Sequence, residues 1–256
     1  MHPSELIERV AAIARRAGDL VLEVYATDFA VAAKSDASPV TLADERAEAS
    51  IVPALERLDP GTPIVAEEAM AAGRAPALDG GRFWLVDPLD GTKEFVGRNG
   101  EFTVNIALVE QGRPVLGVVH APALARTYAG AAGTVWVEDA AGRRPIRCRR
   151  PPPEGLTVVA SRSHGGAQAL ERFLAGRKVA RLATAGSSLK LCLVAAGEAD
   201  VYPRLGRTME WDIAAGHAVV AAAGGSVTRI DNGAPLAYGK PGFDNPHFVA
   251  CGLAAA

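Results

Sequence analysis

The chain of 256 residues is predicted to combine an α+β first half with an α/β second half. Two long amphipathic helix patterns open the sequence, and strand patterns joined by short turns follow them. This order favours helices packed on a mostly antiparallel sheet. After residue 150, strand and helix patterns alternate, as they do in α/β folds. These observations divide the chain into residues 1–150 and residues 151–256.

The predicted boundary is an arginine- and proline-rich stretch, R-R-P-I-R-C-R-R-P-P-P, at residues 143–153. Its arginines would suit a phosphorylated ligand, but a solvated linker is the favoured interpretation of such a charge run.

Composition limits the function classes. Hydrophobic residues make up 49% of the chain, enough for a sizeable core, and a net charge of −2 does not suggest nucleic-acid binding. Three cysteines without paired spacing predict reduced thiols and no zinc site. The N-terminus does not resemble a signal peptide, and no apolar run is long enough to span a membrane. We expect a cytoplasmic protein; peripheral association with the inner membrane and a homodimer are left open.

Two helices are predicted at the start of the chain, the first with Ser4 as its N-cap. After a polar loop at residues 34–39, the second runs from near Thr41 to about Leu58. Asp44 stands three residues after Thr41, so it completes a capping box, serves in catalysis, or does both. The apolar residues of the first helix recur at helical spacing: Leu6, Val10, Ile13, Ala17, Leu20 and Val24.

A short strand is predicted after residues 59–63, D-P-G-T-P, which end the second helix. Ile64 and Val65 form this strand and deliver Glu67 and Glu68 at its end. Because successive side chains of a strand diverge, one glutamate can bind a metal directly while the other interacts with the groups that surround the metal ligands.

The run Phe83–Val86 is predicted to be a buried strand that ends at Asp87. Pro88 cannot donate to a sheet and fixes its own φ, so the chain must turn there. If residues 88–91 form one tight turn, Asp87 and Asp90 point into the same space.

The two residues that follow extend this arrangement. Gly91 lets the backbone approach a ligand closely, and Thr92 is predicted to open a short helix whose free N–H groups favour an anion. Two carboxylates beside such a helix start suit a divalent metal that holds a phosphate. Taken alone, D-P-x-D is equally well interpreted as a polar turn with Asp90 as an N-cap.

The remaining elements follow from the same patterns. Residues 102–109 and 115–120 are predicted strands joined by a hairpin at residues 111–114. Two further strands are predicted at 127–130 and 134–137. In the second half, strands are predicted at 156–160, 179–182, 201–202, 227–230 and 248–251, and helices at 167–175, 187–196 and 212–223.

Four motifs occur in one order and span nearly the whole chain. They are Asp44, the pair Glu67-Glu68, D-P-L-D-G-T at 87–92, and W-D at 211–212 followed by G-G at 224–225. The ordered set resembles the fingerprint of the lithium-sensitive, magnesium-dependent phosphatase superfamily of inositol monophosphatase. The resemblance implies a layered α-β-α-β-α sandwich and phosphatase activity.

Within that superfamily, the chain looks most like the CysQ-type 3'(2'),5'-bisphosphate nucleotidases. It departs from the expected pattern at residues 165–167, G-G-A, which are small and uncharged. The contribution of this loop to substrate binding is therefore left open. The supporting runs are D-G-T-K-E-F (90–95), R-N-G-E-F-T-V-N-I-A-L (98–108), S-R-S-H (161–164), G-S-S-L-K (186–190) and Y-P-R-L-G-R-T-M-E-W-D (202–212).

The metal ligands that the resemblance implies are all oxygens, which suits magnesium, with manganese as a substitute. Glu67, Asp87 and the Leu89 carbonyl would form a first site. Asp87 would bridge to a second site completed by Asp90 and Asp212. The family implies two metals per active site, or three with a weaker one beside Glu67.

The resemblance also implies catalytic roles and a substrate. Thr92, oriented by Asp44, and Glu68 would activate the attacking water, while the N–H groups of Gly91 and Thr92 would hold phosphate oxygens. The substrate would be adenosine 3',5'-bisphosphate, a by-product of sulfate assimilation, hydrolysed to AMP and phosphate. Lys190 and Arg204 would hold its second phosphate. The other implied substrate contacts are His164, Ser188 and Glu210.

Two alternatives accompany this interpretation. An inositol monophosphatase or sugar phosphatase on the same scaffold is the nearer one, although G-S-S-L-K and Y-P-R-L argue against it. The other is a non-catalytic sensor of bisphosphate nucleotides. Asp44 and Thr92 argue against a sensor, because such a protein has no need of groups that activate water.

Overall fold

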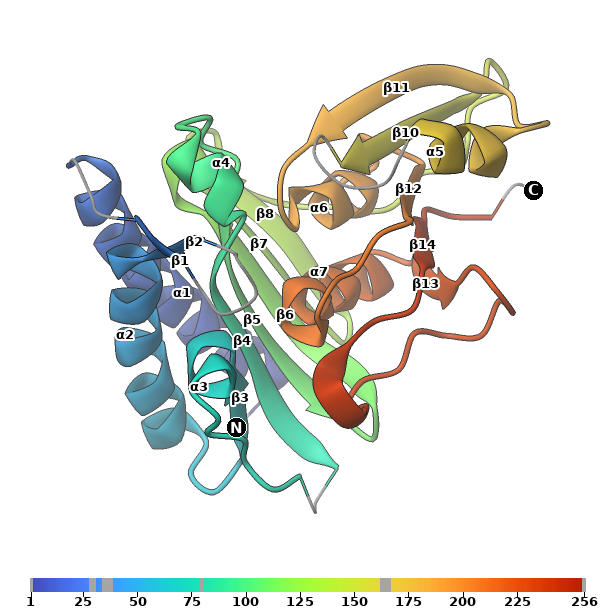
Figure 1. Cartoon of the computed structure of the whole chain (residues 1–256). Coiled ribbons are helices and arrows are strands. Elements are labelled where there is room, and N and C mark those ends of the chain that lie inside the picture. The colour runs from blue at the N-terminus through green and yellow to red at the C-terminus, as the bar shows by residue number, and fades with distance from the viewer. Residues whose placement is uncertain (1, 28–30, 34–38, 79–80, 162–166, 255–256) are drawn as a thin grey trace.

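The computed structural model describes the chain except for residues 1, 28–30, 34–38, 79–80, 162–166 and 255–256. Helices and sheets form successive layers (Figure 1). Helices α1 and α2 cover one face of a seven-stranded sheet, α6 and α7 lie between that sheet and a five-stranded one, and α5 lies beside the smaller sheet. The predicted layered α/β sandwich is confirmed. None of the described helices combines the length and apolarity needed to cross a bilayer.

The elements are distributed as the two halves of the sequence predict, with additions at the edges. The helices are α1 (Pro3–Tyr25), α2 (Leu42–Leu58), α3 (Glu67–Ala71), α4 (Thr92–Val96), α5 (Ala167–Leu174), α6 (Leu189–Ala195) and α7 (Glu210–Ala222), with short 3-10 helices at Pro122–Leu124 and Pro241–Phe243. The larger sheet has the order β3 (Ile64–Ala66), β4 (Arg82–Asp90), β5 (Thr103–Glu110), β6 (Arg113–Ala121), β7 (Arg126–Ala131), β8 (Thr134–Asp139), β9 (Gly142–Pro145). The smaller sheet has the order β11 (Val179–Ala185), β10 (Leu156–Ser161), β12 (Val201–Arg204), β14 (Phe248–Cys251), β13 (Ser226–Arg229), and β1 (Val31–Ala33) pairs with β2 (Pro39–Thr41).

Helix α1 begins earlier than the sequence predicts. Its N-cap is His2, whose ring nitrogen accepts a hydrogen bond from the Ser4 backbone N–H, so the prediction of Ser4 as N-cap is wrong. Pro3 occupies the first helical position, where its missing N–H costs nothing. The side chain of Thr41 lies outside the described residues, so the capping box with Asp44 stays a prediction.

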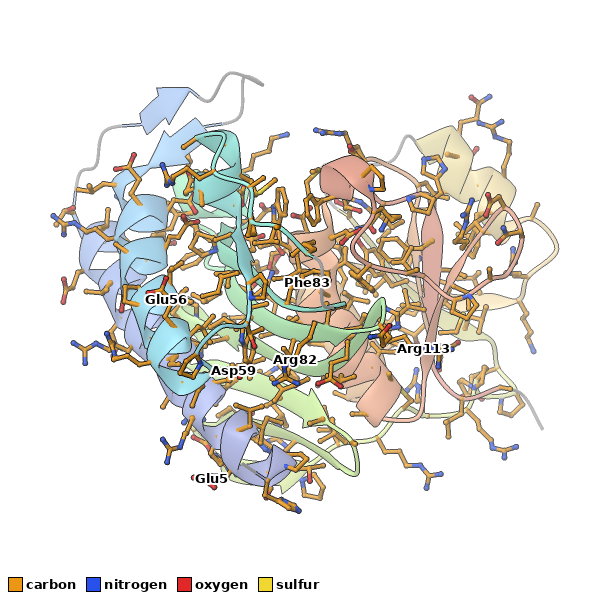
Figure 2. All side chains as sticks on the ribbon, turned by 90° about the horizontal axis from the view of Figure 1, so that it is seen from below. Glu5, Glu56, Asp59, Arg82, Phe83 and Arg113 are labelled. Atoms are coloured by element: carbon orange, nitrogen blue, oxygen red, sulfur yellow. The ribbon has the colours of Figure 1, made fainter. Side chains whose placement is uncertain are left out.

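The larger sheet is antiparallel except for the parallel pair of β3 and β4. Arg82 anchors the start of β4, because it pairs at 2.9 Å with Asp59, which follows α2 (Figure 2). Arg82 also pairs with Glu110 at the end of β5. The β5–β6 hairpin turns at Gln111 and Gly112, whose φ angles of 48° and 73° match the right-handed twist of the strands.

Strand β9 corrects the interpretation as a solvated linker for the start of the arginine-rich stretch, whereas residues 146–153 form no helix or strand. Arg143 and Arg144 belong to an edge strand paired with β8. Arg143 pairs with Glu138 at 2.7 Å, and Arg144 with Asp139 at 2.9 Å. The polar sequence of β9 does not predict a strand by itself; its pairing with β8 holds it in the sheet.

Helix α7 joins the two halves of the molecule. It packs on β5, β6 and β7 of the larger sheet and on β13 of the smaller one. Its backbone lies so close to β6 that a Cβ atom on Gly117 would come within 2.2 Å of the Ala215 carbonyl oxygen. Residues of both halves share one hydrophobic cluster, which includes Val119 and Val219. The division at residue 150 therefore stays a prediction about sequence organisation.

Candidate active site

The end of β4 carries the two aspartates of the D-P-L-D motif. The sequence predicts that the strand ends at Asp87, but β4 continues to Asp90. Asp87 pairs with Asn105 and Asp90 with Thr103, so the strand contains a bulge between the two aspartates. Such a bulge re-aims side chains and accommodates Pro88 within the strand. The carboxylate of Asp87 accepts a hydrogen bond from the Leu89 N–H at 3.0 Å.

The turn into α4 requires glycine at position 91. Gly91 has a φ of 91°, and a Cβ atom there would lie 3.1 Å from the Ser187 Cβ. Thr92 then opens α4, as the sequence predicts. The turn is thereby held against the start of the α6 segment from the second half of the chain.

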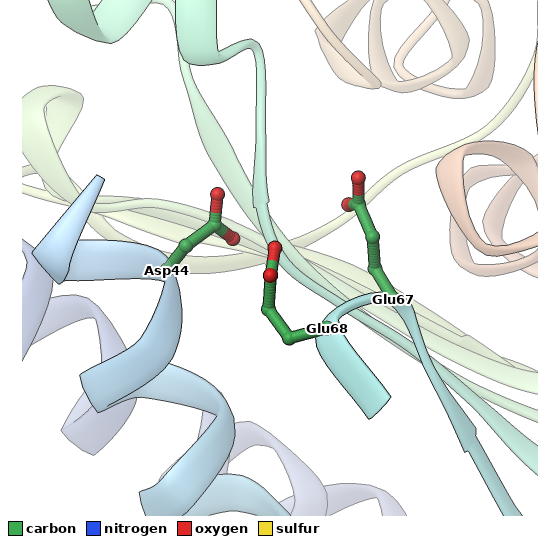
Figure 3. A group of neighbouring side chains, drawn as sticks. All are labelled: Asp44, Glu67 and Glu68. Carbon is green, nitrogen blue, oxygen red and sulfur yellow. The ribbon is translucent and has the colours of Figure 1, made fainter. Parts of the chain in front are cut away.

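A second group of carboxylates comes from α2 and α3. Contrary to expectation, Glu67 and Glu68 do not end a strand with diverging side chains; they are the first two residues of α3. Oxygen atoms of Asp44, Glu67 and Glu68 lie within 4.8 Å of one another. Figure 3 shows the three carboxylates converging from the two helices.

Asp212 enters from the opposite side, in the first turn of α7. Its carboxylate accepts a hydrogen bond from the Met209 N–H at 3.0 Å, which fixes the side chain at the helix start. The Ser188 hydroxyl donates to the Asp212 backbone carbonyl. The α6 and α7 starts are thus linked beside the pocket.

The electrostatics of these aspartates favour a bound cation. Burial, followed by the negative charges of Glu67, Asp90 and Asp212, raises the pKa of Asp87 well above its usual value. Burial likewise raises the pKa of Asp90 to about 6, and burial together with Asp90 raises that of Asp212. Carboxylates that are costly to ionise together become favourable when a cation lies among them. A hard, all-oxygen donor set of this kind fits magnesium.

One pocket of about 340 Å³ brings most of the predicted site residues together. Within it, Lys190 Nζ donates to the backbone carbonyls of Ala185 and Ser187. Burial lowers the pKa of Lys190 to about 8, while the nearby Asp90 charge opposes this effect. The predicted residues that line the pocket are Glu67, Asp87, Leu89, Asp90, Gly91, Thr92, Ser188, Lys190, Arg204 and Asp212.

Two predicted substrate contacts are not placed there. Glu210 is not among the residues that line the pocket, and its side chain is 0% exposed. Its carboxylate accepts from the N–H groups of Gly239 and Lys240 and pairs with the Lys240 ammonium, so the prediction that it accepts from a substrate sugar is wrong. His164 lies outside the described residues.

Sequence reasoning missed three residues. Asn105 on β5 is 0% exposed and donates to Asp90 at 3.4 Å and to Ser188 at 3.3 Å; a lone amide in an apolar strand run was its signal. Arg207 lines the pocket and donates to Asp244 at 2.8 Å. Glu48 lies one helical turn after Asp44, among the buried residues of α2, and that position was its signal.

The site agrees with what comparisons with known proteins found. The sequence profile described as the inositol monophosphatase family matches residues 2–251. The 3'(2'),5'-bisphosphate nucleotidase CysQ of Escherichia coli O157:H7 is 47% identical over 95% of this chain and 98% of that protein. The CysQ of Salmonella typhimurium is 49% identical over 87% of this chain and 89% of that protein.

Solved structures give the same result. The crystal structure of CysQ from Bacteroides thetaiotaomicron superposes with a TM-score of 0.79 at 35% identity, covering 95% of this chain and 96% of that one. An inositol monophosphatase from Anabaena superposes with a TM-score of 0.75 at 26% identity, covering 97% of this chain and 90% of that one. With its fold, its carboxylate pocket and a family match over nearly its full length, the chain belongs to the inositol monophosphatase family.

Proposed function

We propose that the protein is a magnesium-dependent phosphomonoesterase that hydrolyses adenosine 3',5'-bisphosphate to AMP and phosphate, and so clears this by-product of sulfate assimilation in the cytoplasm. The observation that carries the proposal is one pocket that joins buried carboxylates to the buried cations Lys190 and Arg204. The carboxylates suit a metal-held phosphate, and the cations suit a second phosphate. The similarity to CysQ proteins supports the same substrate.

Glu67, Asp87, the Leu89 carbonyl, Asp90 and Asp212 are proposed to hold magnesium, with manganese as a substitute. When bound, the metal supplies Lewis-acid activation of water and neutralises charge on the leaving oxygen. The chain supplies the ligand oxygens and keeps them in place through the bulge of β4 and the first turn of α7. Burial and the charges of neighbouring carboxylates raise the pKa values of Asp87 and Asp212, and a bound cation would offset this cost.

The proton of the attacking water is proposed to pass to Thr92 and Asp44, with Glu68 assisting through a second water. Asp44 is 0% exposed, and Glu68, which lies beside it, is partly buried. Thr92 begins α4 at the pocket wall, and its N–H, with that of Gly91, is proposed to hold phosphate oxygens.

Lys190 and Arg204 are proposed to hold the second phosphate. The positive charge of Arg204 contributes, after burial, to lowering the pKa of Lys190, so the two cations repel each other. A phosphate between them would relieve that repulsion. Among the described residues, Arg204 Nε is a buried donor without a hydrogen-bond partner, which leaves it available to an anion. Ser188 lines the same wall, and we keep His164 as a further proposed contact.

Phosphate release from a panel of substrates tests the proposal. The purified protein is expected to prefer adenosine 3',5'-bisphosphate over inositol phosphates and sugar bisphosphates. EDTA should abolish the activity, magnesium should restore it, and high millimolar lithium should inhibit it. Preference for inositol phosphates would establish the rival phosphatase, and nucleotide binding without turnover would establish a sensor. Restoration by zinc alone would contradict the hard-oxygen site.

A further inference from the structure

Glu48 of α2 is a buried carboxylate next to the site that the proposed reaction does not use. The residue is 7% exposed, and it is not among the residues that line the pocket. One of its oxygens accepts a hydrogen bond from the Glu68 N–H at 2.8 Å, and the other accepts from the Ala69 N–H at 2.8 Å. Both donors belong to the first turn of α3.

These two hydrogen bonds replace the cap that α3 lacks in its own sequence. The N-cap of α3 is Ala66, which makes no side-chain cap hydrogen bond. A helix start leaves N–H groups without partners inside the helix, and a side-chain acceptor normally satisfies them. Here the acceptor comes from another helix, so it fixes the position of α3 relative to α2 as well as the helix start itself.

The geometry links this cap to the catalytic carboxylates. Glu48 stands four residues after Asp44, and residues at that spacing share one face of a helix. The same face of α2 therefore carries Asp44 and, through Glu48, a hydrogen bond to the backbone N–H of Glu68. Since Asp44, Glu67 and Glu68 converge within 4.8 Å, the spacing of that group depends on where α3 starts.

A carboxylate is an unfavourable choice if the cap serves stability alone. Burial raises the pKa of Glu48, the two N–H hydrogen bonds oppose that effect, and the adjacent Glu68 charge adds to it. Serine at position 66 would cap α3 locally without a buried charge beside other carboxylates. Such a local cap would not tie α3 to α2.

We infer that Glu48 is a positioning residue of the magnesium site, which holds Glu67 and Glu68 in register with Asp44 through two hydrogen bonds to the start of α3. The inference rests on the proposed magnesium-dependent reaction. It requires that loss of Glu48 weakens magnesium binding and lowers turnover, while the pocket wall formed by Lys190 and Arg204 keeps its affinity for the substrate.

The test compares Glu48→Ala and Glu48→Gln with Glu56→Gln as a matched control. Glu56 is exposed on the same helix (Figure 2). Glutamine at position 48 keeps one acceptor oxygen but faces the second N–H with an amide donor, so it should retain part of the function. Magnesium binding is measured without substrate, by calorimetry and by the metal-induced shift in melting temperature. Turnover of adenosine 3',5'-bisphosphate is measured across magnesium concentrations.

Glu48→Ala is expected to raise the magnesium concentration for half-saturation at least tenfold and to lower kcat, with KM at saturating magnesium changed less than threefold. Glu48→Gln should fall between Glu48→Ala and the wild-type protein, and Glu56→Gln should match the wild type. The inference is overturned if both Glu48 variants bind magnesium within twofold of the wild type and only their melting temperatures fall. If Glu48→Ala does not fold, Glu48→Gln decides by the same criterion.

These readouts also separate the inference from the proposed function. A wild-type protein that binds magnesium but does not hydrolyse the bisphosphate would refute the proposed substrate, while the binding measurement would still test Glu48. A wild-type protein that binds no magnesium would refute both.

Discussion

On each side of the pocket a buried glutamate accepts hydrogen bonds from two consecutive backbone N–H groups, but the charged neighbours of the two glutamates differ in sign. On the α2–α3 side, buried Glu48 accepts hydrogen bonds from two consecutive backbone N–H groups, those of Glu68 and Ala69. On the α7 side, buried Glu210 accepts from the two consecutive N–H groups of Gly239 and Lys240. Glu210 also pairs with the Lys240 ammonium at 2.5 Å, whereas the neighbour that most raises the pKa of Glu48 is another carboxylate, Glu68.

From this difference we expect the α2–α3 side to depend more strongly on bound metal than the α7 side. Lys240 donates in addition to the carbonyl of Ala237 and to Asn245, and Asn245 donates to the Met209 carbonyl. The start of α7 is therefore held by a cation that the chain itself provides. On the side of α3 and β4, burial and the charges of Glu67, Asp90 and Asp212 raise the pKa of Asp87, and we expect bound magnesium to offset this cost.

The largest expected effect comes from the metal-dependent side. Asp87→Asn should fold but lose nearly all phosphatase activity, because a ligand oxygen becomes an amide and the proposed bridging charge disappears. The metal-free variant should also melt at a higher temperature than the metal-free wild type, since burial and four neighbouring carboxylates disfavour the ionised Asp87. Phosphate release and thermal melting with and without magnesium measure both effects. A folded variant with comparable turnover would contradict the bridging role.

A large loss of stability is expected on the α7 side, where Lys240 of the chain itself neutralises Glu210. Lys240→Met removes the cation beside a fully buried carboxylate, which should cost about 3 kcal/mol of unfolding free energy. The loss should be similar with and without magnesium, in contrast to the Glu48 variants. Urea denaturation at both conditions measures it. A loss that magnesium restores would show that the two sides do not differ as described.

A smaller effect concerns substrate preference on the pocket wall between the two sides. Lys190→Ala and Arg204→Ala should each remove a charge-assisted contact worth about 1.5–3 kcal/mol, a ten- to hundredfold loss in kcat/KM for adenosine 3',5'-bisphosphate. Turnover of 3'-AMP, which lacks the second phosphate, should change little. Parallel losses on both substrates would place these cations at the scissile phosphate instead. The proximity of Lys190 to Asp90 makes that outcome the informative alternative.

The smallest effect is the pH dependence of stability that His217 of α7 contributes. Burial lowers the pKa of His217 to about 4, so the folded protein keeps this ring neutral while the unfolded chain protonates it near pH 6.5. Stability should therefore fall as pH decreases from about 6.5 towards 4, by about 2 kcal/mol at pH 5 from this residue. His217→Gln should reduce the slope of unfolding free energy against pH. An unchanged slope in this variant would contradict the assignment.

Local patterns predicted the elements whose signals are periodic or tightly coded. The buried run before Asp87, the helix start at Thr92 and the apolar α7 follow from residues that neighbour each other in sequence. They also placed ten of the predicted residues at one pocket, because the D-P-L-D-G-T and W-D motifs lie at element ends.

The missed features depend on partners far away in the chain. Strand β9 is polar and is stabilised by β8 and its acidic residues, not by its own pattern. Glu48 meets donors twenty residues further on, and Glu210 meets a loop that begins twenty-nine residues further on. Nothing in the local sequence of Glu210 distinguishes a buried carboxylate from one that faces a ligand, which is why that prediction failed.

Because Gly117 has no side chain, α7 can lie directly against β6, and this contact sets the position of α7 in the active site. Gly117 is not among the residues that line the pocket, yet even a methyl group there would collide with the backbone of α7 at Ala215 and push the helix off β6. Asp212 belongs to α7, whereas Asp87 and Asp90 belong to β4. A contact inside the hydrophobic core thus sets the distance between Asp212 and the carboxylates of β4. Substitutions at this contact would lower the activity without changing any of the reacting groups.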